Sequence, residues 1–488
     1  MSIRGNLLAA TCLTTLAMLA PAQADDLYLD GDDTLVLDRD APDYVYGDIY
    51  IGQNAGGYSL TVTNNATLRG KWGSIGDMTN DNTVVVTDGA QWRTDVPSIF
   101  GGNLRIGRTG SNNTLDISNA GRVTALRSIL VGGSPGSSNN EVLISEGGEL
   151  SSGDDITILG TGNRLTVQSG GRVQTGSFVV GFYGWDNTAS FEGAGTLLQT
   201  EFLTIGSETG NNNEMRISSG AQVVSSEGVI GSYYETNGNS VTVAGSGTDA
   251  EGNSVPSEWK IQQSETMPSL APDLSMGLAG SSSNSLTIAS GGRVSVAGSV
   301  YVGGSSASTD NVISVSGKGS SLTAGGALQV GGSGDKNAVQ VKDGGALTTG
   351  SASIGRQGNR GNTVDVTGGA QWTVNGDLSI NDLPPSSSPV GTAPQSRAEW
   401  NSMYIGPSGR VDVTGQVQVY GQGAMYLGNS ARLEAGSLTL HDGSFLSLYV
   451  ADGDESNPDL SSLIAVDGTA SLDGDLDVTV GSSQLTKN

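Results

Sequence analysis

The sequence contains almost none of the side chains that bind transition metals or crosslink small folds. It has one cysteine, Cys12, and one histidine, His441, in 488 residues. Zinc sites and histidine-based catalytic triads require several such groups in one place, so both classes are excluded. One cysteine cannot form a disulfide within the chain, so a disulfide-stapled fold is excluded as well.

Long apolar runs are also lacking. The one apolar stretch, Leu7 to Leu19, follows Arg4 and is followed by Ala22-Gln23-Ala24. Its length of about 13 residues is below the roughly 18 that cross a bilayer, and this arrangement is typical of a secretory signal peptide. We therefore expect residues 1–24 to be removed on export, and no transmembrane segment elsewhere. Cys12 lies inside the apolar run, which excludes a lipoprotein acylation site.

Basic residues are few. Lys and Arg total 23 against 49 Asp and Glu, a net charge of −26. Removal of residues 1–24 removes only Arg4, which gives 22 − 49 = −27 for the mature chain. Such a chain repels nucleic acid and anionic membranes, so neither is an expected partner. Basic partners and divalent cations remain compatible with this charge, which also keeps a long polar protein soluble.

Glycine is abundant, with 75 residues, and single Val, Ile and Leu residues recur at regular intervals. The recurring pattern is Asn-x-Φ-x-Φ, where Φ is apolar. Its asparagines are Asn82, Asn113, Asn140, Asn163, Asn187, Asn213, Asn239, Asn284, Asn311, Asn337 and Asn362. Subtraction gives steps of 23 to 27 residues, apart from 31 at the first step and 45 between Asn239 and Asn284. A disordered chain keeps no such period.

Each repeat reads as a strand, a glycine turn, a second strand and a polar turn. The turn is a small-residue pair such as Gly170-Gly171, and the second strand ends in an apolar residue followed by glycine, as in Ile205-Gly206. Apolar residues alternate with polar ones in both strands, so each strand buries one face. One repeat buries only four to six apolar side chains, each worth roughly 1.5 to 3 kcal/mol. Ordering costs about 1 to 2 kcal/mol per residue, so the repeats must stack to fold.

The predicted fold is therefore all-β: a right-handed parallel β-helix of about 26-residue coils. At a strand spacing of roughly 4.8 Å it would be a rod on the order of 80 Å long. The repeated asparagine has two interpretations. It is either a turn residue that tolerates left-handed backbone angles, or one rung of an internal ladder in which its amide bonds the same amide one coil away.

Units such as Gly210–Ala221 and Gly361–Trp372 resemble the glycine-rich passenger repeat of type V autotransporters, over about residues 48–380. The segment Ala435–Val480 is similar to the one that precedes the translocating barrel in such proteins. The barrel itself is not expected within this chain, which stops at Asn488. The resemblance implies an exported passenger, at the cell surface and outer membrane of a Gram-negative bacterium or secreted from it.

The chain divides into five predicted segments. They are the signal peptide (1–24), an N-terminal cap (25–47), the repetitive β-helix (48–381), a Pro/Ser-rich loop (382–402) and a C-terminal β-helix end (403–488). A proline-containing insertion near 249–273 interrupts the β-helix and should protrude, because proline cannot join a ladder. The acidic cap includes Asp30-Gly31-Asp32-Asp33, which either blocks the first coil or binds calcium.

The tryptophans are the candidate ligand contacts. Trp92 and Trp372 follow Gly-Ala-Gln and occupy a slot that other repeats fill with Val123 or Leu150, which indicates core packing. Trp259 and Trp400 lie outside that slot, in the expected insertion loops, and are the weak candidates for carbohydrate contact, together with Trp185.

No catalytic site or cofactor is expected. Gly132-Gly133-Ser134-Pro135-Gly136 fits the serine-hydrolase elbow, but it follows a repeat strand, no helix follows it, and such matches arise by chance in Gly/Ser-rich sequence. Carboxylate pairs such as Asp154-Asp155 are expected to be solvated turns. We expect a non-catalytic structural or adhesive stalk for an unknown cell-surface ligand, carbohydrate or protein. The alternative is a β-helical polysaccharide lyase or hydrolase, or a phage-tail-like spike, which needs Asp, Glu, Arg or Lys converging along one face.

Overall fold

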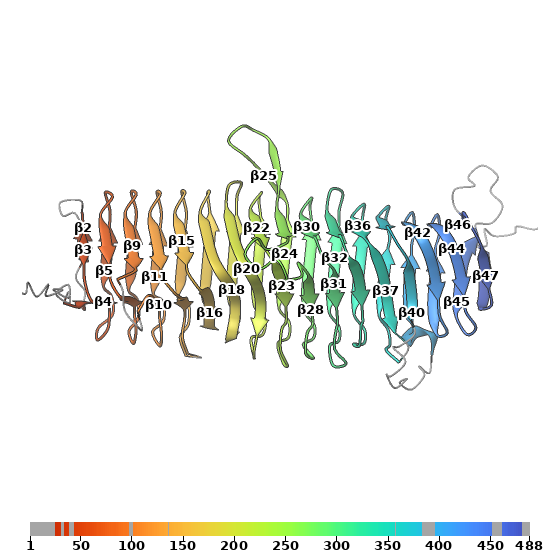
Figure 1. Ribbon diagram of the computed structural model, residues 1–488, viewed down its shortest axis with the longest axis horizontal. Helices are drawn as coiled ribbons and strands as arrows, with labels where there is room; N and C mark the ends of the chain where they lie inside the picture. Colours follow the sequence, from red (N-terminus) through yellow and green to blue (C-terminus); the bar gives the residue numbers. More distant parts are fainter. Residues whose placement is uncertain are drawn as a thin grey trace, which may run out of the picture.

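The computed structural model describes residues 25–30, 34–38, 43–96, 101–134, 136–356, 358–382, 396–450 and 461–480. These residues form one solenoid of stacked β coils (Figure 1). The expected signal peptide lies outside the described residues, and so do residues 383–395 of the Pro/Ser-rich loop. No helix in the described part of the chain has the length and apolar character needed to cross a bilayer.

Directly after each repeated asparagine, from Asn82 to Asn362, the first strand of a coil begins. These strands and the first strands of the remaining coils stack into one parallel sheet, sheet B. Its members in chain order are β2 (Thr34–Leu37), β5 (Ser59–Val62), β8 (Thr83–Val86), β11 (Thr114–Ile117), β14 (Glu141–Ile144), β17 (Arg164–Gln168), β19 (Thr188–Glu192), β21 (Glu214–Ser218), β24 (Ser240–Ala244), β29 (Ser285–Ala289), β32 (Val312–Ser316), β35 (Ala338–Lys342), β38 (Thr363–Val366), β41 (Asn401–Ile405), β43 (Gly423–Leu427), β45 (Phe445–Val450) and β48 (Asp475–Val480).

The rest of each coil lies in a second parallel sheet, sheet A, in which two rows of strands meet at a corner. The row before the corner holds β3 (Tyr44–Val45), β6 (Thr67–Arg69), β9 (Gln91–Thr94), β12 (Arg122–Ala125), β15 (Glu149–Ser152), β22 (Gln222–Ser225), β27 (Glu258–Ile261), β30 (Arg293–Val296), β33 (Ser321–Ala324), β36 (Ala346–Thr349), β39 (Gln371–Val374) and β46 (Leu463–Val466).

The row after the corner holds β1 (Leu27–Leu29), β4 (Asp48–Ile51), β7 (Trp72–Ile75), β10 (Leu104–Ile106), β13 (Ile129–Val131), β16 (Asp155–Thr161), β23 (Glu227–Ile230), β28 (Leu274–Met276), β31 (Val300–Val302), β34 (Ala327–Val330), β37 (Ser351–Arg356), β40 (Leu378–Asp382) and β47 (Ala470–Leu472). Four strands run through the corner without a break: β18 (Arg172–Trp185), β20 (Leu197–Ser207), β42 (Arg410–Val419) and β44 (Arg432–Leu440). The single second strand predicted for each repeat is thus, in most coils, two short strands.

The core is the stack of inward-facing side chains. Leu165 of β17 pairs with Val142 of one neighbouring coil and Ala189 of the other, and all three are fully buried. The same register holds along the ladder, so equivalent apolar residues stack in columns. Alternation in the sequence therefore becomes an apolar interior and a polar outer face, which confirms the predicted parallel β-solenoid.

The first interruption differs from the prediction. Only part of it protrudes: β25 (Ser246–Thr248) and β26 (Ser254–Pro256) form an antiparallel hairpin that projects from the rod (Figure 1). The chain then re-enters the ladder as β27, which pairs with β22 and β30, and leaves it again at residues 262–273. The expectation of one protruding loop over 249–273 was wrong because Glu258–Ile261 keeps the strand alternation between two proline-containing stretches.

The ends of the rod differ from each other. Residues 25–47, expected to be a cap, supply β1, β2 and β3, which pair in parallel register with β4, β5 and β6. At the other end β46, β47 and β48 form the last described coil, and Leu472, Leu476 and Val478 remain about half exposed. The second interruption contains a 3-10 turn, η1 (Arg397–Glu399), directly before β41.

Candidate functional site

The repeated asparagines form an internal ladder. The Nδ2 of Asn213 donates to Oδ1 of Asn239 at 3.0 Å, and its backbone N–H donates to the same oxygen at 3.0 Å. All of the predicted asparagines are buried, and Asn401 extends the ladder. Asn163 deviates, because its Nδ2 bonds the carbonyls of Leu159 and Ser137 while its backbone N–H alone bonds Asn187.

The alternative interpretation of these asparagines as left-handed turn residues was wrong. The positive φ belongs to the residue before them, such as Asn112 (φ 57°) and Asn212 (φ 54°). The ladder is therefore structural and supplies no binding groups at the surface.

The glycine that ends each coil fits against this ladder. Gly206 has φ of 78°, and a Cβ placed on it would lie 2.2 Å from Nδ2 of Asn239. The Φ-Gly pairs found in the sequence thus leave room for the second repeated asparagine that follows them along the chain. This explains their fixed position within the repeat.

Trp259, a predicted ligand contact, is instead a core residue. It pairs in register with Val223 and Val294, is fully buried, and its Nε1 donates to Oγ of Ser225 at 3.0 Å. It therefore fills the same slot as Trp92 and Trp372, which are also fully buried, as predicted. The prediction that Trp259 contacts carbohydrate was wrong because its short strand lies between two proline-containing stretches, which indicated a loop.

The other two candidates remain at the surface. Trp400 is half-buried at the end of η1, with the guanidinium of Arg397 5.6 Å from its ring centre. Trp185 is 42% exposed at the end of β18. They are far apart along the chain, on β18 and beside β41.

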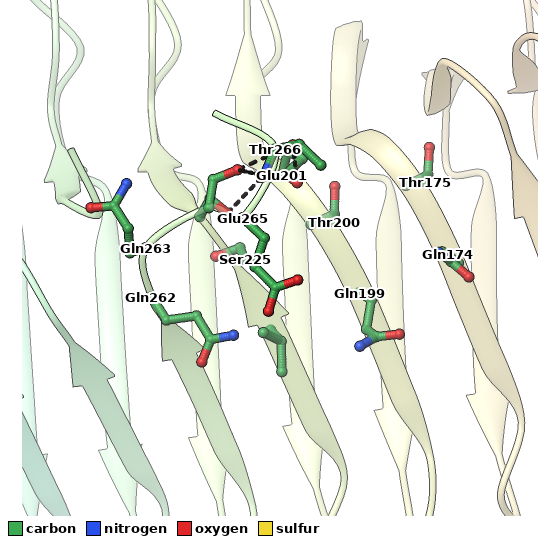
Figure 2. A pocket seen from close by; sticks show the side chains of 13 residues that line it. Gln174, Thr175, Gln199, Thr200, Glu201, Ser225, Gln262, Gln263, Glu265 and Thr266 are labelled. Atoms are coloured by element: carbon green, nitrogen blue, oxygen red, sulfur yellow. Dashed lines mark hydrogen bonds between the residues drawn. The ribbon is translucent and has the colours of Figure 1, made fainter. Parts of the chain in front are cut away.

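A polar groove lies where residues 262–273 cross the corner of sheet A. Its volume is about 310 Å³, and Figure 2 shows Gln174, Gln199 and Gln262 along it. The other lining residues are Thr175, Thr200, Glu201, Val224, Ser225, Ser226, Gln263, Ser264, Glu265 and Thr266. The lining therefore offers amide and hydroxyl groups, with no basic or aromatic side chain among these thirteen described residues.

Glu201 fastens the crossing segment to the solenoid. Its carboxylate accepts a hydrogen bond from Oγ of Ser226 at 2.6 Å and another from Oγ1 of Thr266 at 2.8 Å (Figure 2). The bond from Ser226 is the largest cause of a lowered pKa for Glu201. Within the segment, Gln263 closes the loop by donating to the carbonyls of Pro268 and Leu270 at 3.1 and 2.8 Å. The groove is thus held in shape by its own polar contacts.

Acidic residues elsewhere serve as backbone caps. Oδ1 of Asp30 accepts hydrogen bonds from the backbone N–H groups of Gln53 and Asn54 in the next coil, at 2.7 and 2.9 Å, and these contacts lower its pKa despite partial burial. The rest of that acidic run, residues 31–33, lies outside the described residues. Across the described ranges, no group of three or more His, Cys, Asp or Glu side chains is placed to hold a metal ion. Nothing in the described part of the chain therefore supports the calcium interpretation.

The Asp154-Asp155 pair does not assemble with other acids. Asp155 accepts hydrogen bonds from Oγ of Ser128 at 2.5 Å and from Oγ1 of Thr157 at 2.9 Å.

Neither these contacts of Asp155 nor the polar groove was predicted from the sequence. The available signal for the groove was the insertion itself, together with glutamine at outward positions of consecutive coils.

Comparisons with known proteins add little. No family model and no curated protein matches the chain. A similar solved structure is a crystal structure of a TibA fragment whose hyper-glycosylation is catalysed by TibC. It is 15% identical, covers 84% of this chain and 100% of that chain, and gives a TM-score of 0.38. At this identity and TM-score, the likeness carries no argument about the function of this chain.

Proposed function

We propose that the chain is a non-catalytic exported surface protein that acts as a rigid stalk and presents a binding surface at its insertion, residues 246–273. The observation that carries the proposal is the parallel ladder, which runs from β1 and β2 to β47 and β48 while the hairpin β25–β26 projects from it (Figure 1). Because loops on a rigid scaffold are where binding groups are usually placed, the projecting hairpin and the adjacent groove are the best-placed contact surface.

Export rests on the N-terminal sequence, with its charged start, apolar run and small-residue cleavage site. The mature chain is then free of cysteine, which suits a protein that crosses a membrane before it folds. Its expected location is the surface of a Gram-negative bacterium or the medium around it.

The chemistry of the groove favours binding over catalysis. Both carboxylate oxygens of Glu201 accept hydrogen bonds, and its lowered pKa makes it a poor proton donor near neutral pH. A polysaccharide-cleaving site needs a second, differently tuned acid and, for acidic substrates, basic groups. Glu265 is exposed, and the described lining provides no basic group.

The first test is protease shaving of intact native cells, read with an antibody against the repeat region. Digestion of the chain on intact cells, or its release into the medium, is expected. A chain that stays in the periplasm and resists protease until the outer membrane is opened would refute the surface proposal.

The second test shortens the hairpin. Ser246 and Pro256 are register partners, so residues 247–255 can be replaced by a two-residue Asn-Gly turn without disturbing the ladder. Cells carrying the shortened variant should bind less well to the surfaces that wild-type cells colonise. A variant of Tyr234, an exposed tyrosine in another turn, serves as the matched control: Tyr234→Ser should leave binding unchanged.

A further inference from the structure

Beyond residues 262–273, the corner of sheet A is lined by a column of glycines. Gly326 donates its N–H to the carbonyl of Gly298 at 2.7 Å, and Gly350 donates to Gly326 at 2.7 Å. The column continues at Gly376 and Gly415, joined by a bond of 3.1 Å. A Cβ on Gly376 would lie 2.7 Å from the carbonyl oxygen of Gly350. Close stacking thus requires glycine here, so this column adds no side chains to the corner.

A trough lies beside this column, lined by outward-facing side chains from five successive coils. The register aligns Tyr301 of β31, Gln329 of β34, Ser353 of β37, Ser379 of β40 and Gln418 of β42 in one row along the axis. The two serines in the middle are short and the residues toward the ends are long, so the row is hollow at its centre. The resulting groove has a volume of about 530 Å³, within the roughly 300–1,000 Å³ range of small-ligand sites.

The far wall of the groove is held in place by stacking. The ring of Tyr420 lies parallel to the ring of His441, with centres 4.4 Å apart and planes 5° apart, and its hydroxyl donates to Oε1 of Gln418. Arg356 and Asp382, which also line the groove, are register partners on β37 and β40. On the corner side, Asp377 accepts the backbone N–H of Gln416 at 2.8 Å.

The composition of the lining selects among ligand classes. Amides, hydroxyls and two tyrosine rings match the hydroxyl groups and the apolar CH faces of sugars. One arginine beside two aspartates gives no excess of positive charge, so nucleic acids and acidic polymers are disfavoured. The floor is the face of a sheet whose backbone groups already bond neighbouring coils, so a peptide could not add to it as a strand.

The spacing of the row indicates a polymer. Adjacent coils are about 4.8 Å apart, so five coils repeat similar contacts over roughly 19 Å. A compact ligand would use one or two of these rows, whereas an extended chain of similar units uses all of them. We propose that this trough binds a linear neutral polysaccharide lying along the rod axis, with Tyr301 and Tyr420 at its two ends.

The proposal goes beyond the stalk function and does not depend on it. It concerns coils β31 to β42, on the C-terminal side of the insertion, and it can be tested with purified protein. Loss of the trough would leave surface exposure and hairpin-dependent binding unaffected, so the two proposals can fail separately.

The test is calorimetric titration of the purified full-length chain with cello-oligosaccharides and chito-oligosaccharides of two to six sugar units. In one or both series, affinity should rise with each added unit and level off at the longest. Absence of binding by both series, or affinity independent of length, would overturn the proposal. Tighter binding of an acidic oligosaccharide of equal length would also overturn it.

Variants locate the binding. Tyr301→Ala should weaken binding of the hexamer at least 10-fold, and Ser353→Trp, which fills the hollow, should abolish it. The matched control is Thr204→Trp, which places the same bulk at the equivalent outward position of β20, away from the trough. Unchanged binding in Ser353→Trp, with circular dichroism showing a folded chain, would place the sugar elsewhere and refute the trough as its site.

Discussion

Oδ1 of Asn113 accepts two hydrogen bonds from Asn82 in the preceding coil, one from the side-chain Nδ2 at 2.8 Å and one from the backbone N–H at 3.1 Å. Both residues are fully buried. Each rung thus ties a side chain to a backbone group one coil away. The ladder fixes the register of neighbouring coils because a slip of one residue would break both of these bonds.

Removal of one rung should destabilise the coils on both sides. Asn213→Ala leaves the buried backbone N–H of Asn187 without its partner, at about 1–3 kcal/mol, and also removes one hydrogen bond each from Nδ2 of Asn187 and the carbonyl of Gly184, which keep Gly160 and Asn211 as partners. The expected readout is a lower urea midpoint and faster hydrogen exchange at the amide of Asn187. The control is Asn212→Gly, which keeps the left-handed turn (φ 54° at Asn212) and should leave both unchanged.

Two glycines with the same φ allow the cost of backbone strain to be measured separately from the cost of a steric clash. Gly170 and Gly181 both have φ of 80°, but only at Gly181 would a Cβ meet a neighbour, Nδ2 of Asn213 at 2.0 Å. Gly170→Ala should cost only the left-handed strain of about 1–2 kcal/mol. Gly181→Ala should cost clearly more, measured by chemical denaturation of both variants. Equal losses would show that the ladder does not require the glycine.

The core assignment of Trp259 predicts a large stability effect. Trp259→Ala should cost about 3–5 kcal/mol, the range for truncating a buried aromatic side chain. Trp185→Ala, at a residue that is 42% exposed, should cost far less. Thermal denaturation of the two variants tests this. A mild effect at Trp259 together with a loss of ligand binding would restore its predicted role as a surface contact.

The tether of residues 262–273 should weaken in acid. Hydrogen bonds, first that from Ser226, lower the pKa of the folded Glu201 below its ordinary value of 4.5. A carboxyl with a lowered pKa stabilises the folded state above the unfolded pKa, and that contribution disappears as pH falls through the folded pKa. A spin label on Pro268→Cys should therefore gain mobility as pH falls below about 4.5.

The matching variant is Glu201→Gln, whose amide does not titrate. In that background, the mobility of the label should stay constant over the same pH range. A full acid response in Glu201→Gln would assign the transition to another group.

Much of the fold could be predicted from the sequence because the same alternation of apolar and polar residues recurs from coil to coil. Alternation gives the buried face, and Asn82 and its counterparts mark where the first strand begins. Asn401 was missed because a Pro/Ser-rich segment separates it from the preceding rung, Asn362. Trp259 was misassigned for the same kind of reason, since a strand of four residues between prolines gives too short a pattern.

The grooves could not be predicted. Gln199 and Glu265 lie far apart in sequence, and only the coil stacking and the course of residues 262–273 bring them together. The row from Tyr301 to Gln418 required the register of five coils, in which two of the connections have irregular lengths. Local pattern fixes which face a side chain occupies, but its neighbours along the rod depend on the length of every intervening turn.

The parallel ladder also determines how the rod responds to tension. Its backbone hydrogen bonds point from coil to coil, along the axis, so a pull on the two ends loads them directly. Within one interface between coils, all bonds share the load, but successive interfaces are arranged in series. The force at rupture is therefore set by the weakest interface and does not increase with the number of coils. Additional repeats lengthen the rod without making it harder to break.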